Sequence, residues 1–172
     1  MIPRTATRTD PLDLEGRMSA VVEQVRAYHA EADLEKLWRG FHVGRDAHDG
    51  QNRKSGEPYF THCVSVAEAL TDLRMDVDTI VAGLLHDVVE DTGIGLDDVR
   101  ETFGDDVALL VDGVTKINEI RYANPEAQQA ENYRKLLLTM AKDVRVILIK
   151  LADRLHNMRT IGSLSRERQE AI

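Results

Sequence analysis

The chain has 172 residues, of which 42% are hydrophobic and 5% aromatic, and its formal net charge is −8. This length and composition predict one compact domain with a sizeable core. The acidic balance argues against direct nucleic-acid binding, which requires a basic surface. A single cysteine, Cys63, excludes an intramolecular disulfide and a cysteine-cluster zinc site. Because no apolar run has transmembrane length and no signal-peptide pattern is present, we expect a cytoplasmic protein without membrane contact.

Apolar residues recur at helical spacing along almost the whole chain, which predicts an all-α fold. We expect a flexible leader over residues 1–13, which is rich in proline and threonine, and one helical domain over residues 14–172. Gly104 is expected to end one helix as its C-terminal cap. In chain order the predicted helices are Leu14–His29, Glu31–Asp46, Tyr59–Leu73, Val77–Glu90, Leu96–Phe103, Asp106–Ile117, Pro125–Ala141 and Asp143–Arg159, with a further start at about Ser165.

Two His-Asp dipeptides occur, and their surroundings differ. His48-Asp49 stands in a polar setting, and we interpret it as a helix-terminal histidine followed by a turn residue. His86-Asp87 ends the segment IVAGLLHDVVED, whose first half is so apolar that it must be buried. Polar groups at the end of a buried helix are costly unless something compensates for their desolvation. We therefore treat the second dipeptide as part of a candidate site.

Helical spacing adds two acidic residues to this candidate. At about 100° per residue, Glu90 lies one turn from His86, and Asp91 lies one turn from Asp87. The four groups then share one side of a continuous helix. Three buried carboxylates packed together repel one another, and a divalent cation is the usual remedy. The pattern predicts a metal site.

A second polar stripe interrupts the apolar segment RVILIKLADRLHNMRT. Asp153, His156, Asn157 and Thr160 fall on one helical face, and periodicity alone leaves open whether that face meets solvent or a cavity. His62 opens the helix THCVSVAEAL, where a lone histidine most often has a packing role. Two imidazoles together with carboxylates would form a mixed nitrogen and oxygen site suited to Mn²⁺, Fe²⁺, Zn²⁺ or Mg²⁺.

The words AHDGQNRKSGEPYFTH, GLLHDVVEDT, FGDDVALLVDGVTKI and AENYRKLLLTMAKDVRVILIKLADRLHNMRT together resemble the hydrolase domain of RelA/SpoT-type alarmone enzymes. The resemblance covers roughly residues 47–168. It implies an all-helical HD-domain phosphohydrolase fold with one Mn²⁺ held by His62, His86, Asp87 and Asp153. It also implies hydrolysis of guanosine 3′,5′-bis(diphosphate), or its pentaphosphate relative, to GDP or GTP plus pyrophosphate in stringent-response control.

The same resemblance implies roles for further residues. It assigns the activation of water to Glu90 and Asp91, without deciding which of the two is the base. The intact acidic pair favours a competent hydrolase over a catalytically silent alarmone-sensing module. The RKSG loop and the stripe on the last long helix favour the alarmone over another nucleotide, such as a deoxynucleoside triphosphate or a cyclic dinucleotide. The implied substrate contacts are Arg53, Lys54, Ser55, Asn157 and Thr160.

Two features separate this chain from the family pattern or extend it. Cys63 stands where the family usually has proline after the first metal-binding histidine, and we expect altered packing without loss of metal binding. The wording RKSGEP resembles the long enzymes, and the charged helical pattern at Ile172 has no cap. We therefore expect the N-terminal part of a longer enzyme, in which a synthetase domain follows and the guanine nucleotide alarmone is the partner.

Overall fold

The computed structural model describes residues 13–53, 55–118 and 143–163, and its regular elements are helices. They are α1 Leu14–Tyr28, α2 Leu34–Ala47, α3 Phe60–Asp72, α4 Val77–Leu85, α5 Val88–Asp91, α6 Leu96–Phe103, α7 Asp105–Asn118, α9 Arg145–Arg159 and the 3-10 turn Ile161–Ser163. The all-α prediction is confirmed. The predicted leader, the predicted helix Pro125–Ala141 and the start near Ser165 lie outside the described residues. Within the described ranges, no helix is long and apolar enough to cross a membrane.

Aspartates begin three of the helices. The side chains of Asp13, Asp33 and Asp76 accept hydrogen bonds of 2.8 to 2.9 Å from the backbone N–H three residues further on. Such N-caps satisfy donors that the first turn leaves without intrahelical partners. Because Asp33 caps the second helix, this helix begins at Leu34 and not at Glu31 as expected. Gly104 ends α6 in the left-handed region, as predicted.

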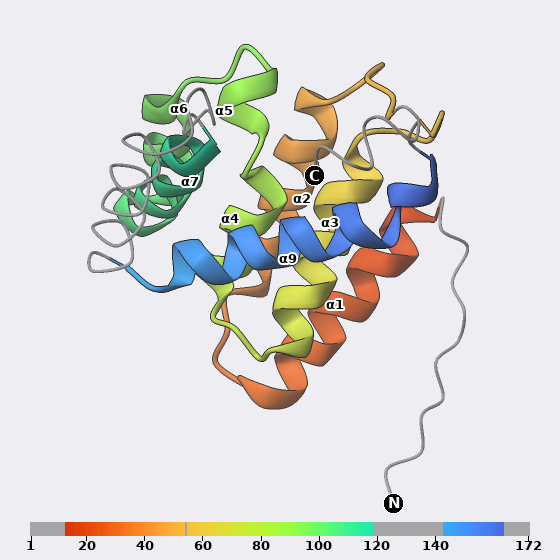
Figure 1. Cartoon of the computed structure of the whole chain (residues 1–172). Helices are drawn as coiled ribbons and strands as arrows, with labels where there is room; N and C mark the ends of the chain where they lie inside the picture. The colour runs from red at the N-terminus through yellow and green to blue at the C-terminus, as the bar shows by residue number, and fades with distance from the viewer. Residues whose placement is uncertain (1–12, 54, 119–142, 164–172) are drawn as a thin grey trace, which may run out of the picture.

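Helix α4 lies at the centre of the domain, and α2, α3, α7 and α9 all contact it. Its sequence VDTIVAGLL is buried almost throughout, which explains why its residues are apolar on every side. Close packing against α3 depends on Gly83, because a Cβ atom there would lie 2.5 Å from Leu70 Cδ1. Helix α9, blue in Figure 1, runs across the front of α3 and α4. The three helices that carry the candidate site are thus in mutual contact.

The predicted helix Val77–Glu90 is wrong as one continuous element, because it divides at His86 and Asp87 into α4 and α5. His86 Nδ1 lies 2.8 Å from the carbonyl oxygen of Gly83, the acceptor that a continuing helix would offer to the backbone N–H of residue 87. Helix α5 then starts anew, with the carbonyl of Asp87 accepting bonds from the next turn. The break turns the two residues into a corner between helices.

Candidate metal centre

Four side chains from α3, from the corner after α4 and from α9 meet at one point. His62 lies in the first turn of α3, His86 and Asp87 form the corner after α4, and Asp153 lies in the middle of α9. His62, His86 and Asp153 are at most 5% exposed, and the Asp87 side chain is 13% exposed. We call these four residues the inner cluster. Residues more than 60 positions apart in the sequence are therefore brought together, as predicted.

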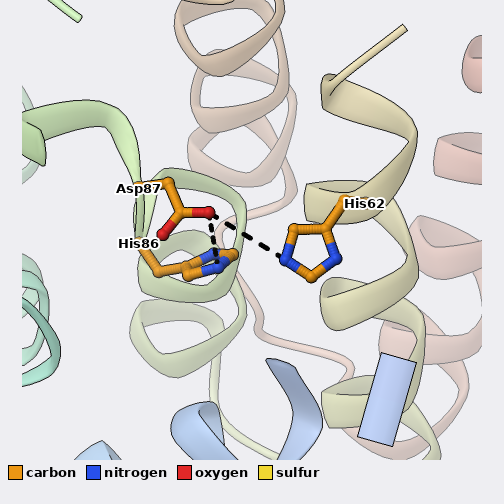
Figure 2. Close-up of side chains that lie close together, drawn as sticks. All are labelled: His62, His86 and Asp87. Atoms are coloured by element: carbon orange, nitrogen blue, oxygen red, sulfur yellow. Dashed lines mark ion pairs between the residues drawn. The ribbon is translucent and has the colours of Figure 1, made fainter. Parts of the chain in front are cut away.

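The ligand atoms of the inner cluster face one another. His62 Nε2 lies 3.2 Å from Asp153 Oδ1 and 3.9 Å from Asp87 Oδ2, and His86 Nε2 lies 3.1 Å from the same Asp87 oxygen. Figure 2 shows both rings pointing toward the Asp87 carboxylate. One ligand atom from each of His62, His86 and Asp87 falls within a span of 4.8 Å, which suits a single cation. The inner cluster is a candidate metal site.

The state of His86 supports a cation at this point. Its Nδ1 faces the Gly83 carbonyl, which only accepts hydrogen bonds, so the proton of a neutral ring sits on Nδ1. Nε2 is buried, and its polar neighbour is Asp87 Oδ2 at 3.1 Å, so the two atoms are placed to share a metal ion. Burial alone would lower the pKa of His86, but the adjacent Asp87 carboxylate outweighs burial and raises it to about 9. The pocket thus favours a positive charge at Nε2, from either a proton or a metal ion.

Both carboxylates of the inner cluster stay ionised. Burial would raise the pKa of Asp87, yet the charge and hydrogen bond of His86 hold that pKa well below its usual range. Burial is likewise overcome at Asp153, whose pKa is lowered by its hydrogen bond with His62 and by the cationic groups around it. Lys150, which sequence reasoning missed, pairs with Asp153 Oδ2 and leaves Oδ1 facing His62. Its spacing of three residues from Asp153 on α9 was the available signal.

The polar stripe of α9 faces inward, which periodicity alone left open. Asn157 Nδ2 donates to Asp153 Oδ1 at 2.6 Å, and His156 Nδ1 lies 2.8 Å from His62 Nδ1. Arg53 from the loop after α2 contacts both, with Nη1 2.9 Å from His156 Nδ1 and Nη2 2.9 Å from Asn157 Oδ1. Burial and then the neighbouring cationic groups lower the pKa of His156 to about 4, so its ring is neutral at pH 7.

The acidic pair of α5 lies at the edge of the site. Glu90 and Asp91, which we call the outer pair, are exposed. The expectation of three buried carboxylates on one helical face is therefore wrong, because the helix breaks before α5 and turns the outer pair toward solvent. The carboxylates inside the site are the buried Asp153 and the partly buried Asp87. The outer pair adjoins the inner cluster without belonging to its interior.

Tyr59 joins the two groups and was not predicted. Its hydroxyl lies 2.7 Å from Asp87 Oδ2 and 3.1 Å from Asp91 Oδ2. Burial and then the charge of Asp87 raise the pKa of Tyr59 far above its usual value, so the hydroxyl keeps its proton and acts as a donor. Its ring stacks on His48 with 4.8 Å between centroids. The signal in the sequence was its position three residues before His62, on the same side of α3.

The remaining candidate residues lie around the rim or elsewhere. Ser55 is exposed, and its hydroxyl donates to Glu57 Oε1 at 3.1 Å, while Lys54 lies outside the described residues. Thr160 caps α9, and its hydroxyl is 3.1 Å from the His156 carbonyl. These positions neither support nor oppose a role in substrate binding.

Two further sequence interpretations have clear outcomes. His48 ends α2 as predicted, but it is buried, and Gln51 Oε1 lies 2.9 Å from its Nδ1, so its setting is not the polar one expected. Cys63 is fully buried beside His62, and burial raises the pKa of its thiol. A buried protonated thiol packs as a small apolar side chain.

Comparison with known proteins gives a consistent result. A family model described as HD domain matches residues 41–172. The chain is 47% identical over 148 residues to the bifunctional (p)ppGpp synthase/hydrolase SpoT of Escherichia coli, covering 86% of this chain and 21% of that protein. It is 56% identical over 137 residues to the GTP pyrophosphokinase of Streptomyces coelicolor, covering 80% of this chain and 16% of that protein.

A solved structure adds the fold. It concerns a metazoan orthologue of SpoT that, by its description, hydrolyzes ppGpp and plays a role in starvation responses. The TM-score is 0.62 with 31% identity, and the match covers 79% of this chain and 78% of that one. By contrast, this chain spans only about a fifth of the curated relatives above. With the site geometry and these matches together, the chain belongs to the HD-domain family and is an HD domain of the RelA/SpoT type.

Proposed function

We propose that this domain hydrolyses guanosine 3′,5′-bis(diphosphate), and the corresponding pentaphosphate, at the 3′ position with one Mn²⁺ ion. Water attacks the phosphorus attached to the 3′ oxygen, the bond between that oxygen and phosphorus breaks, and pyrophosphate leaves GDP or GTP behind. The observation that carries the proposal is the convergence of His62, His86, Asp87 and Asp153, with the outer pair beside them.

The chemistry of the inner cluster is consistent with Mn²⁺. Two imidazole nitrogens and two carboxylate oxygens form a ligand set that a borderline divalent cation accepts. When bound, such an ion polarises a phosphate oxygen and lowers the pKa of a nearby water molecule. His62, His86, Asp87 and Asp153 would hold it through the four atoms that face one another.

The outer pair would accept the proton of the attacking water. Glu90 and Asp91 are exposed, and the Tyr59 hydroxyl lies between Asp91 and Asp87, so Asp91 and its neighbour Glu90 stand beside the proposed metal site. We propose that one of them accepts the proton of the attacking water, because carboxylates serve as general bases when they are positioned close to it. Tyr59 donates to Asp91 and to Asp87, and it keeps the two carboxylates in a fixed relation.

Positive charge for the substrate comes from the loop that follows α2. Arg53 extends toward α9, and its guanidinium presents donors that suit phosphate oxygens or the face of a guanine. We propose that Arg53, Lys54 and Ser55 contact the phosphates and base, and that Asn157 and Thr160 contact the nucleoside. The net charge of −8 makes this local grouping important, because the chain as a whole repels an anionic substrate.

The names of the relatives cover two opposite reactions: the Escherichia coli protein is named as both a synthase and a hydrolase, and the Streptomyces coelicolor protein as a pyrophosphokinase. Since this chain aligns with only 16% to 21% of those proteins, their names alone do not assign its activity. The hydrolytic direction is favoured because the part that matches the HD-domain family, residues 41–172, contains the inner cluster and the outer pair. We propose that in the longer relatives the synthetic reaction belongs to another part of the chain.

The test is Mn²⁺-dependent release of pyrophosphate from guanosine 3′,5′-bis(diphosphate) by this chain. We expect pyrophosphate release to require Mn²⁺. Deoxynucleoside triphosphates and cyclic dinucleotides, added as competitors, should inhibit this release only weakly. Equal turnover of those nucleotides would favour a general HD phosphohydrolase. Binding of the alarmone with Mn²⁺ present but without pyrophosphate release would favour a sensing module.

A further inference from the structure

Three side chains meet at one nitrogen of His156. Its Nδ1 lies 2.8 Å from Nδ1 of His62 and 2.9 Å from Nη1 of Arg53. The other branch of the Arg53 guanidinium donates to Asn157 Oδ1 at 2.9 Å, and Asn157 donates to Asp153 Oδ1 at 2.6 Å. Each branch of Arg53 therefore reaches a residue of the inner cluster through one intermediate side chain.

The hydrogen-bond roles in this chain of contacts follow from Arg53. A guanidinium only donates, so His156 Nδ1 must accept, and the proton of its neutral ring sits on Nε2. An accepting Nδ1 on His156 in turn requires that His62 Nδ1 carries a proton and donates it. The other nitrogen of a neutral His62 ring, Nε2, can then offer its lone pair to a metal ion, which would replace the hydrogen bond between this ring and Asp153. That is the nitrogen that faces Asp153 and Asp87.

The two histidines of the inner cluster differ in the group that fixes the proton on Nδ1. His86 has its proton fixed on Nδ1 by a backbone carbonyl, that of Gly83. His62 Nδ1 instead faces a side chain, with His156 Nδ1 at 2.8 Å. A metal-binding histidine normally donates its second ring nitrogen to an oxygen acceptor, which fixes its tautomer and orientation. At His62 a neutral imidazole takes the place of that oxygen.

We propose that His156 is a positioning residue for His62, and that Arg53, by donating to His156, sets the tautomers of both rings so that His62 Nε2 is free to bind the metal. This inference rests on the metal site of the proposed function, and it assigns His156 no contact with substrate. It also makes Arg53 a link between the loop proposed to bind phosphate and the metal ligands. If Arg53 turns from His156 to a substrate phosphate, His156 Nδ1 then accepts a hydrogen bond from His62 alone.

The first test measures Mn²⁺ affinity of the full chain in the absence of nucleotide. His156→Leu removes the acceptor and should weaken Mn²⁺ binding about 10- to 100-fold, the usual loss for an outer partner of a metal-binding histidine. His156→Asn places an amide oxygen where Nδ1 was and should retain affinity within about threefold. His42→Leu, which replaces an exposed histidine stacked on Trp38, is the matched control and should leave affinity unchanged.

Unchanged Mn²⁺ affinity in His156→Leu, or equal losses in the leucine and asparagine variants, would overturn the proposal. Thermal melting of the metal-free variants shows whether each one folds. If His156→Leu does not fold, the asparagine variant and a second measurement on the unmodified protein still test the positioning role of His156. Because no nucleotide takes part, a failure of alarmone hydrolysis would leave these results unaffected.

The second measurement reads the tautomers directly. In the chain loaded with diamagnetic Zn²⁺, long-range ¹H–¹⁵N correlation spectra report which ring nitrogen of each histidine carries the proton. We expect His156 to be protonated on Nε2 and unprotonated on Nδ1, with His62 protonated on Nδ1. A proton on His156 Nδ1 would contradict the proposal, because that nitrogen then cannot accept from His62 or Arg53.

Discussion

The inner cluster and the outer pair are both acidic and adjacent, yet their surroundings differ sharply. Asp87 and Asp153 are buried, paired with histidines and held ionised by them. Glu90 and Asp91 are exposed on a short helix that begins after a break. Buried, permanently charged groups suit the holding of a cation, whereas exposed carboxylates exchange protons with water. The division of metal binding from proton transfer that we propose rests on this difference in burial.

The largest expected effect comes from removing a member of the inner cluster. Asp153→Ala removes the oxygen that faces His62 and leaves Lys150 without its partner. We expect Mn²⁺ binding and pyrophosphate release to be lost together, by more than about 10³-fold in activity. Calorimetric titration with Mn²⁺ and a pyrophosphate assay measure the two losses.

The matched control is Asp78→Ala. Asp78 lies in α4, the helix that leads to His86, and its replacement breaks an ion pair with Lys36 of α2 without touching the inner cluster. It should keep Mn²⁺ affinity. Full Mn²⁺ binding by Asp153→Ala would remove this residue from the ligand set.

A smaller effect is expected for the outer pair. Glu90→Gln keeps the shape of the side chain but removes its ability to take a proton, so kcat should fall about 10²- to 10⁴-fold while Mn²⁺ affinity is retained. Asp97→Asn, a change at an exposed carboxylate on α6, controls for the loss of one surface charge. Loss of Mn²⁺ binding in Glu90→Gln would show that Glu90 belongs with the metal ligands and not with the outer pair.

A smaller effect again is expected for the residue that connects the two groups. Tyr59→Phe removes the hydroxyl between Asp87 and Asp91 while keeping the ring that stacks on His48. We expect kcat to fall about tenfold with little change in KM, because the outer pair loses its fixed position.

Tyr28→Phe deletes a hydroxyl that donates to the Met75 carbonyl, away from the site, and provides the matched control. If the two phenylalanine variants lose activity equally, Tyr59 has only a packing role.

The smallest effect concerns a group of charges outside the site. At Asp76, burial is outweighed by hydrogen bonds from Thr79 and by Arg145, which together lower the pKa. A folded-state pKa below the unfolded value contributes stability above about pH 4, and this stability is lost as the pH falls through the folded pKa. Asp76→Asn keeps a good helix cap and should melt with a weaker dependence on pH between 3 and 5.

Because the Asp76 side chain is 44% exposed, solvent screening limits the difference to at most about 1 kcal/mol. Thermal melts at several pH values measure it. An identical acid dependence in the wild-type and variant chains would show that Asp76 makes no such contribution. Activity at pH 7 should be the same in both.

Much of this protein was determined by local sequence. Helical periodicity predicted most of the helices, since it acts over three or four residues. The polar groups His86 and Asp87 stood out because they end an apolar helix. His62 was identified from the family resemblance, because a single histidine at a helix start has no local pattern that separates ligation from packing.

Tertiary structure decided what local periodicity could not. The α9 stripe of Asp153, His156 and Asn157 faces inward because α9 packs across α3, while Leu151, on the other side, is 58% exposed. The break after Leu85 exposes the outer pair, an outcome that a continuous helical wheel does not contain. The contacts of Tyr59 with the acidic residues, and the contact between Arg53 and His156, depend on distances between separate helices and loops. Such distances are fixed by packing and not by spacing along the chain.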